Sequence, residues 1–185
     1  MTSPTRTRTA GATLWFTGLP SAGKTTLANA LERYLREAGR QVEILDGDAV
    51  RPVLSPELGY SRADRDANVA RIGWVAALLA RNGVLTLASV VSPYAAARDG
   101  VRAGHEASAV PFFEIHVATP VEVCAQRDVK GLYARQRSGN LAGLTGIDDE
   151  YEAPAHPDLL LNTADRSVDS AVAELIALLE KENLL

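Results

Sequence analysis

The run GLPSAGKT at residues 18–25 constrains the fold more than any other feature of the sequence. It has the spacing G-x-x-x-x-G-K-[ST] and lies between a β-rich run and an amphipathic helical pattern. Glycines at both ends allow backbone N–H groups to turn toward a phosphate, the following helix adds the positive end of its dipole, and the lysine adds a point charge. The alternative is a glycine-rich turn that only caps a helix. The context favours a nucleoside triphosphate site at Gly18, Ser21, Ala22, Gly23, Lys24, Thr25 and Thr26, with Thr25 as the Mg²⁺ ligand.

The rest of the chain alternates short β-rich runs with longer helical patterns. We expect strands at 13–17, 42–46, 84–91, 112–118 and 159–161. Strands separated by helices require right-handed crossovers and a mainly parallel sheet that is covered on both faces. The pattern therefore predicts an α/β, three-layer P-loop NTPase or kinase fold with a mainly parallel five-stranded sheet.

Helix boundaries are visible as end signals. A helix that begins at Lys24 should stop at Gly39, a second should begin after Ser61, which Asp64 follows at capping-box spacing, and the last should begin near Ser167. For the last helix we expect Val168, Val172, Leu175 and Leu179 to form the buried stripe.

Two segments stand apart from the periodic pattern. Residues 1–12 contain basic but no acidic side chains, and we predict a disordered basic tail ahead of one domain at 13–185. Residues 126–157 have weak periodicity, and a loop of that length predicts a mobile lid. Four basic residues against one acidic residue give 126–137 a charge of +3, which suits closure over anions, although an ordinary mixed-charge helix is the alternative.

Composition excludes several classes of protein. The net charge of −4 disfavours binding of long nucleic acid, and the longest apolar stretch, at 72–80, is too short to span a membrane. The single Cys124 supports neither an intramolecular disulfide nor a zinc module. We expect a soluble cytoplasmic protein with small-molecule substrates.

The carboxylates Asp46 and Asp48 follow the second expected strand at its carboxyl end, where α/β sheets place ligands. They could steer an acceptor hydroxyl and organise magnesium waters. Asp-Gly is also common turn chemistry, so from these residues alone a functional role and a simple turn stay equally open.

Six segments carry a resemblance to adenylylsulfate kinase, the family that uses ATP to phosphorylate the 3′-hydroxyl of adenosine 5′-phosphosulfate. They are GLPSAGKTT (18–26), DGDAVR (46–51), LGYSRADRDANVARIG (58–73), SVVSPYAAAR (89–98), VCAQRDVKGLYARQRSG (123–139) and LTGIDDEYEAP (144–154). The resemblance implies sulfate activation to 3′-phosphoadenosine 5′-phosphosulfate, ATP and Mg²⁺ as cofactors, and a homodimer.

The same resemblance implies roles for individual residues. The catalytic set would be Lys24, Asp48 and Ser92, with Arg127 and Thr163 near the adenine of ATP. The acceptor would contact Asp46, Asp48, Arg51, Tyr60, Arg65, Asn68, Val91, Ser92, Lys130, Leu144 and Thr145. Arg65 and Asn68 are three apart and share a helix face, for which a solvated face is the alternative.

Several positions depart from the family pattern. Ala49 and Ala95 replace an asparagine and an arginine, and Leu144 replaces a phenylalanine, which should weaken base stacking by ~1 kcal/mol. These changes keep a kinase for another small nucleotide, nucleoside or sugar acceptor open, as well as a non-catalytic nucleotide-binding module. Ser92 is a phosphoserine in some members, but Ser-Pro is also typical of a helix N-cap, and we expect a cap and substrate contact.

Overall fold

A computed structural model describes residues 10–185, which form a five-stranded sheet in the order β2-β3-β1-β4-β5. The strands are β1 (Ala12–Thr17), β2 (Val42–Asp46), β3 (Leu85–Ser89), β4 (Phe112–Val117) and β5 (Leu159–Leu161). All neighbouring strands are parallel, which confirms the predicted fold class. Residues 1–9 of the expected tail lie outside the described residues. β1 begins one residue earlier than predicted, whereas the strands predicted at 84–91 and 112–118 are shorter, at 85–89 and 112–117. Gly11 is also buried, and a Cβ there would meet the carbonyl oxygens of Ala80 and Val84.

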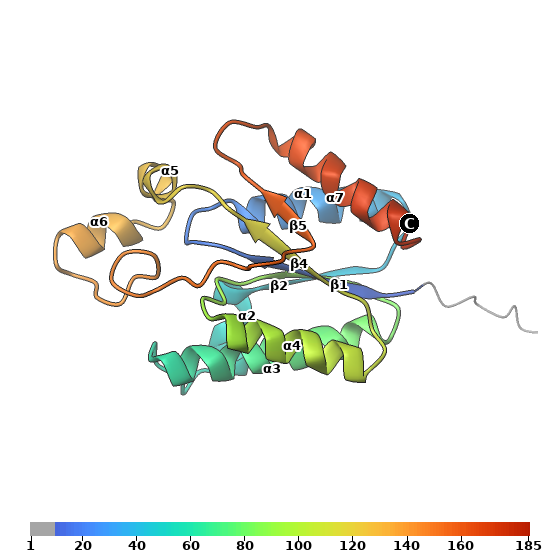
Figure 1. The fold of residues 1–185 in the computed structure, drawn as a ribbon, viewed down its shortest axis with the longest axis horizontal. Helices are drawn as coiled ribbons and strands as arrows, with labels where there is room; N and C mark the ends of the chain where they lie inside the picture. Colours follow the sequence, from blue (N-terminus) through green and yellow to red (C-terminus); the bar gives the residue numbers. More distant parts are fainter. Residues whose placement is uncertain (1–9) are drawn as a thin grey trace, which may run out of the picture.

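Helices cover both faces of the sheet (Figure 1). They are α1 (Lys24–Glu37), α2 (Gly47–Leu54), α3 (Arg62–Ala80), α4 (Ala95–Ala107), α5 (Val121–Arg127), α6 (Leu132–Arg137) and α7 (Val168–Lys181). The two-residue period of β1 divides the core: Leu14 and Phe16 pack in the cluster under α1 and α7, whereas Trp15 packs in the cluster under α3 and α4. The sheet is therefore apolar on both sides, as the sequence predicts for a three-layer fold.

The helix ends predicted at Gly39, Ser61 and Ser167 are confirmed. Gly39 has a φ of 77°, Ser61 accepts a hydrogen bond from Asp64 N at 3.2 Å, and Ser167 accepts one from Ser170 N at 3.1 Å. The prediction that Val168 is buried is wrong, since 37% of it is exposed. Val168 opens α7 at the rim of the main pocket, so its side chain faces that cavity and not the core.

The segment at 126–157 has more structure than a long loop. It contains α6 and a second stretch, residues 143–152, which we call the strap; both extend beyond the carboxyl ends of the strands (Figure 1). The Tyr133 hydroxyl donates to Pro20 O at 3.0 Å, which ties α6 to the phosphate loop. Mobility of this lid stays a prediction. Within residues 10–185, no helix is both long and apolar enough to cross a membrane.

Candidate functional site

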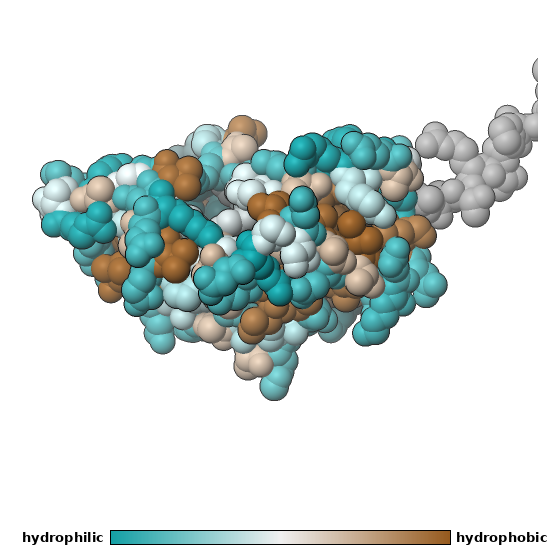
Figure 2. Space-filling view, turned by 90° about the horizontal axis from the view of Figure 1, so that it is seen from above, coloured by the Kyte–Doolittle hydropathy of each residue, from teal (hydrophilic) through white to brown (hydrophobic). Residues whose placement is uncertain are grey.

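A cavity of about 660 Å³ lies at the carboxyl ends of the strands, between the phosphate loop, α3 and the lid. Such a volume fits ligands of nucleotide size, and in α/β sheets this edge is where ligands bind. In space-filling view, a hollow separates the end that carries α5 and α6 from the body of the molecule (Figure 2). The lining includes these predicted site residues: Ser21, Gly23, Lys24, Thr25, Thr26, Asp46, Asp48, Arg51, Tyr60, Arg65, Asn68, Val91, Ser92, Arg127, Lys130 and Thr163.

The phosphate loop has the backbone that its glycines predict. Gly18 and Gly23 have φ values of 145° and 106°, and a Cβ on Gly18 would lie 2.5 Å from Val117 O. Lys24 is buried, and its ammonium group donates to Gly18 O and Leu19 O at 2.8 Å each. Burial lowers the pKa of Lys24 to about 8. Ala22 lies within the loop, and its carbonyl accepts hydrogen bonds from Thr119 Oγ1 and Thr163 Oγ1.

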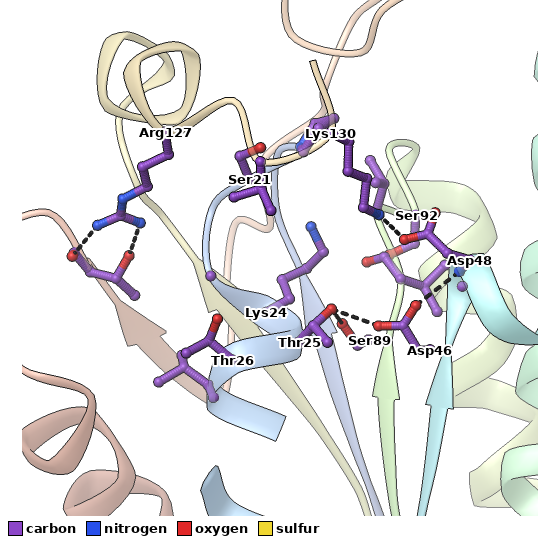
Figure 3. A pocket seen from close by; sticks show the side chains of 18 of the residues that line it. Ser21, Lys24, Thr25, Thr26, Asp46, Asp48, Ser89, Ser92, Arg127 and Lys130 are labelled. Carbon is purple, nitrogen blue, oxygen red and sulfur yellow. Dashed lines mark hydrogen bonds and ion pairs between the residues drawn. The ribbon is translucent and has the colours of Figure 1, made fainter. Parts of the chain in front are cut away.

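Three side-chain oxygens meet at the start of α1. Thr25 Oγ1 donates to Asp46 Oδ2 at 2.6 Å and lies 3.1 Å from Ser89 Oγ (Figure 3). This oxygen set fits Mg²⁺, which is commonly held by few protein oxygens together with water and phosphate. Across residues 10–185, no cluster of three or more His, Cys, Asp or Glu side chains could hold a metal ion.

The two aspartates that follow β2 have different surroundings. Asp46 caps α2, because its Oδ1 accepts a hydrogen bond from Asp48 N at 2.9 Å, so the segment starts a helix and is not a free turn. The Asp48 side chain is 68% exposed and forms an ion pair with Lys130 across the mouth of the cavity (Figure 3). The structure thus brings the lid lysine and the candidate catalytic carboxylate together.

Arg65 and Asn68 of α3 are not on a solvated face. Arg65 donates to Tyr60 O, Thr145 Oγ1 and Gly143 O at 2.7–2.9 Å, and 13% of its side chain is exposed. Asn68 is 4% exposed, and its Oδ1 has no hydrogen-bond partner among residues 10–185. Buried polar atoms are normally paired, so this unpaired oxygen in the cavity wall leaves an acceptor for a ligand.

Ser92 does not cap a helix, so that prediction is wrong. The N-cap of α4 is Tyr94, because Ser92 and the proline after it precede the helix as irregular chain. The Ser92 hydroxyl accepts from Trp15 Nε1 and donates to Thr17 Oγ1, both at 3.0 Å. Ser92 has a φ of 41° and is 1% exposed, and both partners of its hydroxyl are residues that do not line the cavity.

The remaining predicted residues lie at opposite ends of the site. Arg127 donates to Thr163 Oγ1 and Thr163 O, at 2.8 and 2.6 Å, which joins the two residues predicted near adenine. Leu144 and Thr145 are 5% and 2% exposed and are not among the described residues that line the cavity. Leu144 belongs to the core cluster under α1 and α7, whereas Thr145 reaches the site through Arg65.

Sequence reasoning missed several residues of the site. Ser89 was detectable, because it ends a strand at the edge where ligands bind. Arg166 and Val168 line the cavity from the start of α7, and no local motif distinguishes them from ordinary helix-start residues.

A parallel sheet, a phosphate loop and a nucleotide-sized cavity at the carboxyl ends of the strands define the phosphate-loop NTPase class. Residues 10–162 match the sequence model of the family described as "Adenylylsulphate kinase", and the chain belongs to that family. It is 51% identical to "Adenylyl-sulfate kinase" of Synechococcus sp. (strain JA-3-3Ab) over 162 residues, which are 88% of this chain and 90% of the relative.

Solved structures agree with this assignment. The Mycobacterium tuberculosis APS kinase in complex with AMPPNP and APS is 45% identical, with a TM-score of 0.90 over 92% of this chain and 98% of that one. A hexameric APS kinase from Thiobacillus denitrificans is 37% identical, with a TM-score of 0.72 over 96% of this chain and 30% of that one.

Proposed function

We propose that this kinase transfers the γ-phosphoryl group of ATP to the 3′-hydroxyl of adenosine 5′-phosphosulfate, giving ADP and 3′-phosphoadenosine 5′-phosphosulfate. The observation that carries the proposal is one cavity with a phosphate loop on one wall and Asp48, Arg65 and Asn68 on the other. The relative whose structure holds AMPPNP and APS matches this chain over nearly its whole length, which supports the same pair of ligands here.

On the donor side, ATP would lie along residues 18–26, with its adenine beside Arg127 and Thr163. The N–H groups of the loop and the start of α1 would bind the phosphates, and Lys24 would turn from its loop carbonyls toward them. Mg²⁺, held by Thr25, would neutralise charge on the phosphoryl oxygens.

On the acceptor side, the proposed contacts are those predicted from the sequence: Asp46, Asp48, Arg51, Tyr60, Arg65, Asn68, Val91, Ser92, Lys130, Leu144 and Thr145. Arg65 offers a guanidinium to an anionic group, and the free Asn68 oxygen offers an acceptor to a ribose or base donor. Leu144 packs in the core, so the acceptor would have to contact its side chain where the strap begins.

The chemistry follows from placement. The 3′-oxygen attacks the γ-phosphorus in line, the bond from that phosphorus to the bridging oxygen of ADP breaks, and the hydroxyl proton passes to Asp48 or water. Because such transition states are loose, positioning and charge stabilisation matter more than a strong base. Lys130 would leave Asp48 when the acceptor enters and would contribute charge from the lid.

An acceptor panel tests the proposal. ADP release should be fastest with adenosine 5′-phosphosulfate and slow with other nucleotides, nucleosides and sugars. Lys24→Ala, assayed alongside, controls for contaminating kinases. A preference for another acceptor would establish a different small-molecule kinase, and calorimetric binding without any product would establish a non-catalytic binding module.

Two further expectations belong with this proposal. We propose a homodimer; the hexameric relative, of which this chain covers 30%, supports oligomeric assembly in the family. Light scattering of the purified chain tests this, and a monomer would refute it. A cytoplasmic location stays a prediction, and localisation of a tagged full chain would check it.

A further inference from the structure

We propose that Arg98, which lies outside the cavity lining, is a positioning residue that holds the acceptor wall of the site in its working shape. The proposal rests on the proposed function, because the wall in question is the one assigned to the acceptor. Arg98 is 2% exposed and, among the described residues, contacts three segments that are distant from one another in the chain.

The guanidinium forms three directional hydrogen bonds. Nε donates to Glu114 Oε1 of β4 at 2.6 Å, Nη1 donates to Ser92 O at 2.7 Å, and Nη2 donates to Glu152 O in the strap at 2.6 Å. The Glu114 carboxylate, 10% exposed, balances the buried charge. A planar fork fixed to β4 therefore sets the positions of two loops.

The first of these loops needs such support. Ser92 has a φ of 41°, a left-handed conformation that non-glycine residues rarely adopt, and such residues persist where their surroundings over-determine them. Bonds from Trp15 and to Thr17 hold the side chain of Ser92, but its carbonyl is held chiefly by Arg98. Since Val91, Ser92 and Pro93 line the cavity, this carbonyl bond shapes the wall.

The second loop, the strap, carries the support to Arg65. Glu152 N donates to Pro93 O at 2.8 Å, and the Glu152 carboxylate accepts from Ala95 N at 2.7 Å. Further along the strap, Gly143 O and Thr145 Oγ1 accept from Arg65. Arg98 thus holds the strap at Glu152, and the other end of the strap holds the guanidinium of Arg65 in the cavity wall.

The test compares Arg98→Gln and Arg98→Lys with Arg102→Gln. Arg102 lies one turn further along α4 and pairs with Glu114 and Asp158, but it does not contact Ser92 or the strap in the described part of the chain. Both Arg98 variants should raise the KM for adenosine 5′-phosphosulfate about tenfold or more, with the KM for ATP changed less than about twofold. Arg98→Lys should not rescue, since an ammonium group keeps the charge but not the planar fork. Parallel rises in both KM values would overturn the proposal.

Hydrogen exchange gives a readout that needs no activity. In the full chain without substrates, amides of the strap should exchange at least about tenfold faster in both Arg98 variants than in wild type or Arg102→Gln, while amides of α1 stay unchanged. Unchanged exchange in the strap would overturn the proposal even if the enzyme is active. A wild-type chain that is inactive on adenosine 5′-phosphosulfate would instead refute the proposed function. The hydrogen-exchange measurement would then still decide whether Arg98 positions the strap.

If the Arg98 variants do not fold, Glu152→Ala tests whether the strap is held by Arg98 or by the Glu152 carboxylate. Its side chain is 28% exposed, and the change leaves Arg98 and its partner Glu152 O in place while it frees the strap from Ala95 N and Arg62. Because Arg98 still holds the Glu152 carbonyl in this variant, we expect the acceptor KM to stay within about twofold of wild type and the strap to exchange as in wild type. A rise of about tenfold in the acceptor KM would assign the positioning role to the Glu152 carboxylate and overturn the proposal.

Discussion

The two walls of the cavity are built in different ways. The shape of the phosphate loop depends mainly on local features, the glycines at 18 and 23 and the bonds of Lys24 to carbonyls five and six residues away. Distant residues of the described chain add hydrogen bonds to the carbonyls of Pro20 and Ala22. The wall that we propose for the acceptor, the acceptor wall, is assembled from distant parts, since Arg65 meets Thr145 across 80 residues and Arg98 meets Glu152 across 54. A local motif can encode a generic phosphate site, whereas the acceptor wall requires the whole fold.

The largest effect should come from breaking the local wall. Lys24→Ala removes the buried ammonium group that we place against the transferring phosphoryl group, and turnover should fall by roughly 100-fold to 1,000-fold. Steady-state ADP release measures this. Lys181→Ala, a change at an exposed lysine of α7, is the control and should match wild type. Undiminished turnover in Lys24→Ala would remove Lys24 from the mechanism.

A smaller effect on turnover should come from changing Asp48, which lies between the two walls. Asp48→Asn keeps the shape of the side chain but loses the carboxylate that would orient the hydroxyl, and kcat should fall by about 100-fold or less, toward the low end for general-base groups. The affinity for AMPPNP by calorimetry should change little. Asp99→Asn, at an exposed position of α4, serves as the matched change. Equal losses in nucleotide affinity and kcat would place Asp48 on the donor side instead.

The pH dependence of nucleotide binding separates the two walls further. Because burial lowers the pKa of Lys24 to about 8, the ammonium group loses its proton as pH rises through that value. The Kd for AMPPNP should therefore rise about eightfold from pH 7.5 to 9, in proportion to the loss of protonated Lys24. Lys24→Arg stays charged over this range and should give a flat profile. An equal rise in that variant would assign the titration to another group.

The smallest effect should come from one bond in the acceptor wall. Thr145→Val removes the hydroxyl that accepts from Arg65 and should raise the acceptor KM about threefold, consistent with one hydrogen bond, with the KM for ATP unchanged. Thr86→Val is the control, because the buried Thr86 hydroxyl has no partner among residues 10–185. If the two variants behave alike, the Arg65–Thr145 contact does not shape the site.

This contrast also explains what could be predicted. The strands, the phosphate loop and the caps at Ser61 and Ser167 depend on short-range patterns, so the sequence indicates them directly. The cap assigned to Ser92 was wrong because bonds to Trp15 and Thr17, distant in the chain, hold the serine in a loop. The placement of the strap against Arg65 depends on the same kind of distant contact, which no periodicity reveals.

The residues that we propose for acceptor binding could not be assigned from residue patterns alone. Residue pattern alone left Arg65 and Asn68 open between a ligand site and a solvated face, and the family resemblance selected the site. In the structure both residues line the cavity, with Asn68 buried and Arg65 largely buried. Arg98 stayed undetected because a buried arginine on a helix has no local signature, and its partners lie on β4, the loop after β3 and the strap.

The most direct test of the account follows the phosphoryl group itself. Wild-type protein is incubated with Mg²⁺, adenosine 5′-phosphosulfate and ATP labelled at the γ-phosphate, and the products are separated and identified by phosphorus NMR and mass spectrometry. We predict one labelled product, 3′-phosphoadenosine 5′-phosphosulfate, formed in equal amount with ADP. Release of ADP without label on the 3′-oxygen of the acceptor would contradict the account.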